Sequence, residues 1–370
     1  MPSYQQRESG LWSVRFDIIE NGMYKTKRLS GFKLKNDAKQ AYIQFMADYK
    51  PTGLGIQSKS YIFDDLLEEY FKYYSPETRE STIYEKRHTF AKYITPLFTQ
   101  QNIKKIPQTK LADWQSSLWN MKVSYRQKSK VRNFFNHFLN YCEQFGIQNK
   151  LKNIKLPRNT DVKKDITFWE LDDFNNFIKY VDNSFWRTFY YFLFYTGVRI
   201  GEACAFYPKD YNIKNGNISI NKSLSYKTID GSIFKIVPTK NYKNYSKPIP
   251  DVLIGELKNI SMSGVYLFGR NNETPLARQT LAYTLDYYIK RAQDSGEKIK
   301  RITPHGFRHS YVSMLINLGV DVYTIAKLIG DTVEMVIKIY GHMYTNELKN
   351  AINKINNIGQ ESGQIISNIS

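Results

Sequence analysis

The chain has 370 residues, enough for two or three domains, and a formal net charge of +19, which favours an anionic polymer as its partner. Hydrophobic residues make up 42% of the sequence and include 22 phenylalanines, which excludes a disordered tail protein. No apolar run approaches the roughly 20 residues of a membrane-spanning helix, so no membrane partner is expected.

The N-terminus and the cysteines indicate the compartment. The first residues, Met-Pro-Ser-Tyr-Gln-Gln-Arg, lack the apolar region of a signal peptide. Cys142 and Cys204 fall in amphipathic or apolar helical contexts, so we expect buried thiols in a reducing environment. No spacing of Cys and His is typical of a zinc site. We therefore expect a cytoplasmic protein without bound metal.

The first predicted unit is a small sheet with one helix, within residues 10–50. One strand face is apolar at alternate positions, the period of a half-buried strand: Trp12, Val14, Phe16 and Ile18. Asn21-Gly22 is a strong hairpin signal. The returning strand, 24–29, carries three basic side chains: Lys25, Lys27 and Arg28. Asn36 is expected to cap a helix that runs to Tyr49.

A helical unit is predicted after a linker at residues 51–55, Pro-Thr-Gly-Leu-Gly. Its first two helices are expected at 61–74 and at about 81–93, the second capped by the pair Ser81-Thr82. The last helix is the clearest, because one stripe along it is apolar: Val131, Phe134, Phe135, Phe138, Leu139 and Cys142.

A basic cluster lies at the start of that last helix. Residues 122–132, Lys-Val-Ser-Tyr-Arg-Gln-Lys-Ser-Lys-Val-Arg, contain five cations and no acid. Four of the cations lie one turn apart in pairs: Arg126, Lys128, Lys130 and Arg132. We expect one face of the helix to pack while the other face contacts phosphates.

The last region begins after a polar linker at 159–164. Helices are predicted at 169–180, 184–195 (ended by Gly197), 200–206, 278–294, 305–318, 322–329, 332–339 and, in the tail, 346–357. Strands are predicted between Asn217 and Pro250, at 218–220, 233–237 and 247–250, with a turn at Asp230-Gly231.

Five residues of this region have side chains that suit one reaction. Arg199 lies in Thr-Gly-Val-Arg-Ile-Gly-Glu, Lys240 in Pro-Thr-Lys-Asn, and His305 and Arg308 in His-Gly-Phe-Arg, while Tyr340 opens Tyr-Gly-His. Two guanidinium groups can bind a phosphate in a two-pronged geometry and neutralise it. A phenol can act as the nucleophile, and we expect nearby guanidinium groups to lower its pKa. Imidazole and ammonium groups can transfer the protons.

The order, spacing and flanks of these motifs resemble the tyrosine recombinase (phage integrase) family. The resemblance implies that Tyr340 attacks a DNA phosphate held by Arg199 and Arg308. It also implies that His305 accepts the phenolic proton or orients the phosphate, and that Lys240 acts as general acid from a turn beside the minor groove. The 3′-phosphotyrosyl bond keeps the energy of the phosphodiester, so the family needs no cofactor for rejoining.

Position 331 departs from the family pattern. The family usually has Leu-Gly-His at its final motif, whereas this chain has Ile329-Gly330-Asp331. Tyr340 follows nine positions later, which is the family spacing and favours it over Tyr344. Two interpretations compete: Asp331 orients Arg308 or His305, which we favour, or the enzyme is slow or inactive.

Three neighbouring residues have simpler expected roles. Glu202, one turn beyond Arg199, is expected to pair with that arginine. His309 and His342 are interpreted as structural.

The resemblance also implies an architecture: a multidomain, mainly α fold with small β-sheets. The expected domains are an arm-type DNA-binding domain at 1–52 with a three-stranded sheet and a helix, a helical core-binding (SAM-like) domain at 58–158, and a mixed α+β catalytic domain with a C-terminal tail at 165–370. The implied partners are double-stranded attachment-site DNA, a Holliday junction, and further copies of the chain in a dimer or tetramer. A directionality factor and DNA-bending proteins are candidate accessory partners.

The implied function is site-specific recombination for integration and excision of a phage or mobile element. Two alternatives remain open at this point. One is a non-catalytic DNA-binding regulator derived from a recombinase, suggested by Asp331. The other is an enzyme like type IB topoisomerases, which shares the catalytic residue types.

Overall fold

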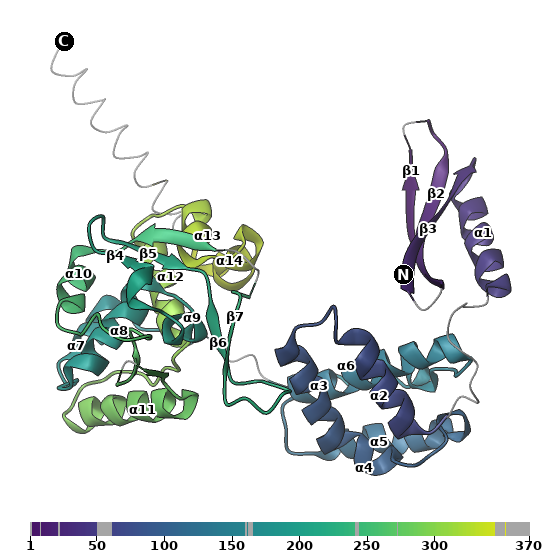
Figure 1. Ribbon diagram of the computed structural model, residues 1–370, viewed down its shortest axis with the longest axis horizontal. Coiled ribbons are helices and arrows are strands. Elements are labelled where there is room, and N and C mark those ends of the chain that lie inside the picture. Colours follow the sequence, from purple (N-terminus) through teal and green to yellow (C-terminus); the bar gives the residue numbers. More distant parts are fainter. Residues whose placement is uncertain are drawn as a thin grey trace, which may run out of the picture. The chain divides into compact units, whose positions relative to one another are not determined.

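The computed structural model describes residues 2–7, 9–20, 23–49, 61–159, 161, 166–240, 244–271, 273–344 and 352. The chain divides into two compact units: Met1–Glu69 with Phe98–Pro107, and Tyr70–Leu97 with Gln108–Ser370 (Figure 1). The predicted turn at Asn21-Gly22, the linker at 51–55, most of the linker at 159–164 and nearly all of the helical tail at 346–357 lie outside the described residues.

The first unit begins with the predicted three-stranded sheet and helix. Its antiparallel strands are β1 (Ser3–Gln6), β2 (Trp12–Glu20) and β3 (Met23–Phe32), with β2 in the centre, followed by α1 (Lys35–Asp48). Alternate residues of β2 form the small core with Ala38 of α1: Val14, Phe16 and Ile18. The period-2 pattern therefore identified the buried face correctly.

The predicted start of α1 was wrong. The N-cap is Leu34, and Asn36 lies inside the first turn. The carboxylate of Asp37 accepts a hydrogen bond of 3.3 Å from the backbone nitrogen of Leu34, so the helix begins earlier than an Asn36 cap would allow.

The helical region runs over both units, and its last helix packs as predicted. Its elements are α2 (Phe63–Tyr74), α3 (Glu80–Tyr93), α4 (Thr95–Phe98), η1 (Ile103–Lys105), α5 (Gln108–Asn120), α6 (Tyr125–Cys142), η2 (Glu143–Phe145) and η3 (Lys150–Asn153). Ser124 is the N-cap of α6, and its hydroxyl accepts a hydrogen bond from the backbone nitrogen of Gln127; the helix packs against α3 and α5. Its predicted apolar stripe is buried except for the half-buried Phe134.

The expected cap of α3 was also wrong. Ser81 and Thr82 lie inside the first turn, and the N-cap is Arg79, whose side chain makes no capping bond. Glu80 occupies the first helical position instead, where its negative charge suits the positive end of the helix dipole.

The remaining elements form one mixed region within the second unit. Its helices are α7 (Leu171–Ile178), α8 (Ser184–Thr196), α9 (Ile200–Cys204), η4 (Pro208–Asp210), α10 (Asp251–Leu257), α11 (Arg278–Asp294), α12 (Gly306–Asn317), α13 (Val322–Ile329), α14 (Val333–Tyr340) and η5 (Gly341–Met343). Its strands are β4 (Tyr211–Asn212), β5 (Asn217–Ile220), β6 (Ser223–Ser225), β7 (Lys235–Val237), β8 (Tyr245–Pro248), β9 (Gly269–Arg270) and β10 (Thr274–Pro275). β4, β5 and β8 form one antiparallel sheet, and β6 pairs with β7.

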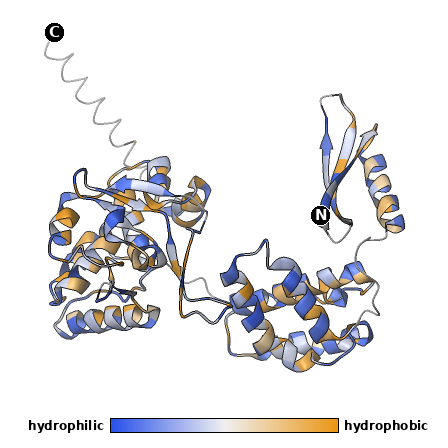
Figure 2. Cartoon of the chain, viewed as in Figure 1, coloured by the Kyte–Doolittle hydropathy of each residue, from blue (hydrophilic) through white to orange (hydrophobic). Residues whose placement is uncertain are grey.

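The core of this region is centred on α8, which is buried over most of its length and contacts α7, α10 and α12. Figure 2 shows hydrophobic and hydrophilic residues alternating around its amphipathic helices. Trp169 was expected to start a helix, but α7 begins at Leu171. The reason is that Trp169 is buried and fixed by hydrogen bonds to Ser310 (2.8 Å) and to the carbonyl of Lys300 (2.7 Å).

Other boundaries moved as well, and some elements were missed. α9 ends at Cys204, earlier than the predicted Phe206, and β8 lies at Tyr245–Pro248, two positions before its predicted place. α10 was not predicted. Among the described residues, no helix is both long enough and apolar enough to cross a membrane.

Candidate active site

Arg199 stands at a turn between two helices. α8 ends at Gly197, which has a left-handed φ of 57°, and Arg199 is the N-cap of α9. Its guanidinium Nη1 donates to the Glu202 carboxylate at 3.1 Å, and its backbone nitrogen donates to the same carboxylate at 2.9 Å. Glu202 is buried, so this pair, expected from the sequence, fixes the arginine strongly.

Arg308 is buried near the start of α12 and joins the ends of two other helices. Its Nη1 donates to the carbonyl of Gly197 (3.0 Å), at the end of α8, and to that of Ile329 (2.8 Å), at the end of α13. Helix C-termini carry partial negative charge and unpaired carbonyls, so a guanidinium is well placed there. Only 4% of the arginine side chain is exposed.

Lys247 on β8 also joins the ends of α8 and α13, and sequence reasoning missed this contact. Its Nζ donates to the carbonyl of Thr196 and, at 2.7 Å, to that of Leu328, in the same two helix ends. Burial, and then the charge of Arg308, place the pKa of Lys247 well below its usual value. Nothing in the sequence distinguishes Lys247 from the other lysines, because its partners are backbone carbonyls.

Asp331 links the two arginines. One oxygen of its carboxylate, Oδ2, accepts from Arg199 Nη2 at 2.6 Å and from Arg308 Nη2 at 2.9 Å. Of the two interpretations from the sequence, this geometry matches the orienting one, and it extends to Arg199. Among the described residues, no hydrogen bond joins Asp331 to His305.

Three predicted site residues line one pocket of about 540 Å³: Arg199, Lys240 and His305. Lys240 is exposed on a turn after β7, as predicted. Desolvation of the imidazole, followed by the charges of Arg308, Arg199 and Lys240, lowers the pKa of His305. The pocket therefore brings a neutral imidazole and an exposed lysine side chain to Arg199.

Tyr340 ends α14 with its hydroxyl 2.6 Å from Nδ1 of His309. The His309 ring in turn lies against His305, with ring centroids 4.8 Å apart. Burial raises the pKa of Tyr340 to about 12, although the charge of Arg308 acts to lower it. The charge of Arg308 thus acts in the expected direction, but in the DNA-free protein desolvation outweighs it.

The expected phosphate-binding face of α6 needs correction, because three of its four cations have partners within the protein. Arg132 donates to Gln115 (2.7 Å) and to two backbone carbonyls, those of Leu151 (3.0 Å) and Ile154 (2.8 Å). Lys128 donates to the carbonyl of Trp119 at 2.5 Å. Folding thus uses these donors, and only Arg126 of the four is exposed without such a contact among the described residues.

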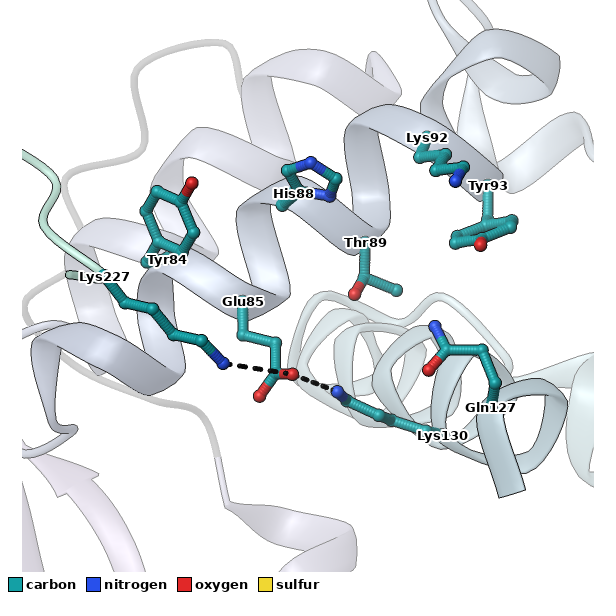
Figure 3. A pocket seen from close by; sticks show the side chains of 9 residues that line it. All are labelled: Tyr84, Glu85, His88, Thr89, Lys92, Tyr93, Gln127, Lys130 and Lys227. Carbon is teal, nitrogen blue, oxygen red and sulfur yellow. Dashed lines mark hydrogen bonds and ion pairs between the residues drawn. The ribbon is translucent and has the colours of Figure 1, made fainter. Parts of the chain in front are cut away.

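The fourth cation, Lys130, belongs to a pocket between α3 and α6 (Figure 3). Its ammonium pairs with Glu85, which also lies 3.4 Å from Lys227. The other lining residues are Tyr84, His88, Thr89, Lys92, Tyr93 and Gln127. The basic cluster at residues 122–132 contains no acid in the sequence, but the structure brings Glu85 to it from another helix, α3.

The basic residues of the first unit lie on two faces of its sheet. Lys27 sits over the ring of Phe45, 4.7 Å from its centroid, and therefore faces α1. Arg28 points the other way, because side chains alternate along a strand, and it pairs in register with Arg15 of β2. Lys25 shares the face of Lys27 by the same alternation. Sequence reasoning missed Arg15.

Comparisons with known proteins match this arrangement. Residues 164–347 match the phage integrase family, and residues 62–119 match the phage integrase N-terminal SAM-like domain. The chain belongs to the phage integrase family. The ICEBs1 integrase of Bacillus subtilis is 26% identical over 322 residues, covering 82% of this chain and 84% of the relative. Tyrosine recombinase XerA of Pyrococcus furiosus is 28% identical over 214 residues, covering 56% of this chain and 66% of the relative.

Solved structures confirm the fold class. A Tn1549 transposon integrase in complex with transposon right-end DNA has a TM-score of 0.65 at 16% identity, covering 79% of this chain and 98% of that one. A lambda integrase dimer bound to a core site has a TM-score of 0.54 at 14% identity, covering 90% and 92%. The chain is thus a tyrosine-type site-specific recombinase with the multidomain, mainly α fold. These matches give no support to the regulator or topoisomerase alternatives.

Proposed function

We propose that this recombinase cuts and rejoins attachment-site DNA through a 3′-phosphotyrosine on Tyr340, for integration and excision of a phage or mobile element. The observation that carries the proposal is the convergence of Arg199 and Arg308 on one anionic oxygen. The pocket that holds Lys240 and His305 adjoins this point, and Tyr340 is linked to it through the His309 ring.

The proposed reaction balances without cofactor or metal. Arg199 and Arg308 bind the non-bridging oxygens of the scissile phosphate. Tyr340 Oη attacks phosphorus and loses its proton, with His305 as acceptor or as a further phosphate ligand. The bond from phosphorus to the 5′-oxygen breaks, and Lys240 donates a proton to that oxygen. A 5′-hydroxyl of the partner strand then reverses the steps, which releases the tyrosine.

The proposed assembly is a dimer or tetramer on double-stranded DNA, working through a Holliday junction in a bacterial cytoplasm. The lambda integrase relatives of this fold were solved as a dimer on a core site and as a tetramer on a Holliday junction. We assign arm-site binding to residues 1–52, core-site binding to 58–158 and catalysis to 165–370. A directionality factor and DNA-bending proteins are the proposed accessory partners.

The test is covalent-adduct formation on nicked attachment-site DNA. Tyr340→Phe removes a single oxygen, so we expect it to abolish the adduct and to leave DNA binding intact. Tyr344→Phe, four residues on, is the matched control and should form the adduct normally. Adduct formation by the first variant, or its loss in the control alone, would contradict the assignment of the nucleophile.

A further inference from the structure

In each of the two arginines of the site, Nη1 binds groups that hold the guanidinium in place, and Nη2 binds the carboxylate of Asp331. Nη1 of Arg308 binds the carbonyls of Gly197 and Ile329, and Nη1 of Arg199 binds Glu202 and, at 3.5 Å, the carbonyl of Gly330. These bonds hold each guanidinium in place. Nη2 of each arginine instead points to the gap between them.

Asp331 fills that gap. Its Oδ2 accepts from both Nη2 groups, at 2.6 and 2.9 Å, while its Oδ1 accepts from the backbone nitrogen of Thr332 at 3.1 Å. The carboxylate is largely enclosed, with 16% of the side chain exposed. Two guanidinium groups that share one anionic oxygen reproduce the contact expected with a phosphate oxygen.

We propose that Asp331 is a built-in anion of the phosphate clamp, for which the scissile phosphate must compete. The proposal rests on the proposed function, in which Arg199 and Arg308 bind that phosphate. In the DNA-free protein the carboxylate neutralises the clamp and keeps both guanidinium groups aimed at one point. An incoming phosphate either displaces the carboxylate or binds beside it, and in both cases meets its negative charge.

The direction of the effect follows from Coulomb's law. Two like charges a few ångströms apart at a protein surface repel strongly, so removing one should strengthen anion binding by about tenfold or more, even with screening by salt. Asparagine keeps the shape of Asp331 and an acceptor oxygen, and it removes only the charge. Asp331→Asn should therefore open the clamp to anions without releasing the arginines.

The first experiment measures binding of inorganic phosphate to the full-length, DNA-free protein by titration calorimetry. We expect Asp331→Asn to bind phosphate about tenfold or more tightly than wild type. Asp321→Asn is the matched control, because it changes the net charge equally at the exposed N-cap of α13, and it should bind like wild type. Adding Arg199→Lys to Asp331→Asn should remove the gain, which places the bound phosphate at the clamp.

The outcomes are separable. Phosphate binding by Asp331→Asn that is equal to or weaker than that of wild type, or undetectable, would overturn the proposal, as would an equal gain in Asp321→Asn. Thermal unfolding followed by circular dichroism checks that each variant is folded. Asp331→Ser is a second neutral variant with the same expected gain, should the asparagine protein fail to fold. None of these measurements needs recombination, so they stand even if the proposed function fails.

A second experiment measures the same competition during cleavage. On attachment-site DNA whose scissile phosphate is replaced by a neutral methylphosphonate, the substrate no longer repels Asp331. We compare the rate of adduct formation on ordinary DNA with the rate on methylphosphonate DNA. The replacement should reduce this rate by a smaller factor in wild type than in Asp331→Asn. The reverse order would contradict the built-in anion, whereas no adduct from wild type on ordinary DNA would instead contradict the proposed function.

Discussion

At the scale of single residues, burial keeps both Tyr340 and His309 neutral. Burial, the neighbouring His305 and the charge of Arg308 lower the pKa of His309 to about 4, while the pKa of Tyr340 is raised to about 12. A neutral imidazole beside a neutral phenol gives one hydrogen bond and no ion pair at pH 7. In the proposed reaction, the proton of Tyr340 therefore leaves only as the phenol attacks, when the bond to phosphorus takes over the developing charge.

The lowered pKa of His309 predicts a pH-dependent stability. The unfolded chain protonates this histidine near pH 6.5, whereas the folded chain does so only near pH 4. Between these values the unfolded state binds more protons, so the free energy of unfolding falls as the pH drops from about 6.5 to about 4. In His309→Gln the free energy of unfolding should decrease less over this pH range than in wild type, as measured by urea unfolding at several pH values. His342→Gln, at an exposed position, should keep the wild-type dependence, and an unchanged slope in His309→Gln would contradict the prediction.

Motif reasoning found the residue types of the site but not their mutual contacts. It anticipated the pair of Arg199 and Glu202, because those residues lie one helical turn apart. It could not find that Asp331 bridges two arginines from other segments, or that Lys247 binds backbone carbonyls. Such contacts depend on which helix ends meet in space, and no spacing along the chain encodes that.

At the scale of elements, the site is built on the C-terminal ends of α8 and α13. Each helix ends in a left-handed glycine, Gly197 or Gly330, and each offers its last carbonyls to Arg308 and Lys247. A Cβ on Gly330 would lie 2.2 Å from the ring of Tyr245, so close packing as well as φ requires glycine there. Gly197 was predicted to end its helix, but the close packing at the two glycines was not predicted.

Helix α6 carries cations that are bonded within the protein and one, Arg126, that is exposed. We expect Arg132→Ala to lower the free energy of unfolding by about 2 kcal/mol, because it leaves two carbonyls and a buried amide oxygen without their charged donor. The measurement is urea denaturation. Arg126→Ala, at an exposed position of the same helix, should leave stability within about 0.5 kcal/mol of wild type and weaken DNA binding instead. Equal stability of the two variants would show that Arg132 is not structural.

Element boundaries were predicted best where the local signals agreed. α11 and α13 begin and end at their predicted residues, because apolar periodicity and flanking loops agree. α1 and α3 start earlier than their predicted caps, because an acidic residue in the first turn outweighed a nearby Asn or Ser. β8 shifted because burial of Lys247, unexpected for a lysine, sets its register against β5.

At the scale of the whole molecule, the order of strands and helices followed from the change of apolar period along the chain, and the fold class followed from the family resemblance. Positive charge in the sequence did not identify which side chains could contact DNA, because a positive residue can face either surface of a sheet or helix. Lys27 and Arg28 are neighbours that point to opposite faces, and the exposed Arg15 and Arg28 share the outer face, the one turned away from α1.

The outer face of the first sheet therefore predicts separate recognition of distal arm sites. Reversing Arg15 and Arg28 together to Glu should remove protection of the arm sites in footprints on complete attachment DNA, because each lost cation gives up phosphate contacts. Core-site cleavage should persist, as it should in a chain that begins near Ser58. Lys39→Glu, exposed on α1, is the control for charge alone and should keep arm protection. Unchanged footprints in the double variant would leave the sheet as a structural appendage, and loss of core cleavage would show that it supports catalysis instead.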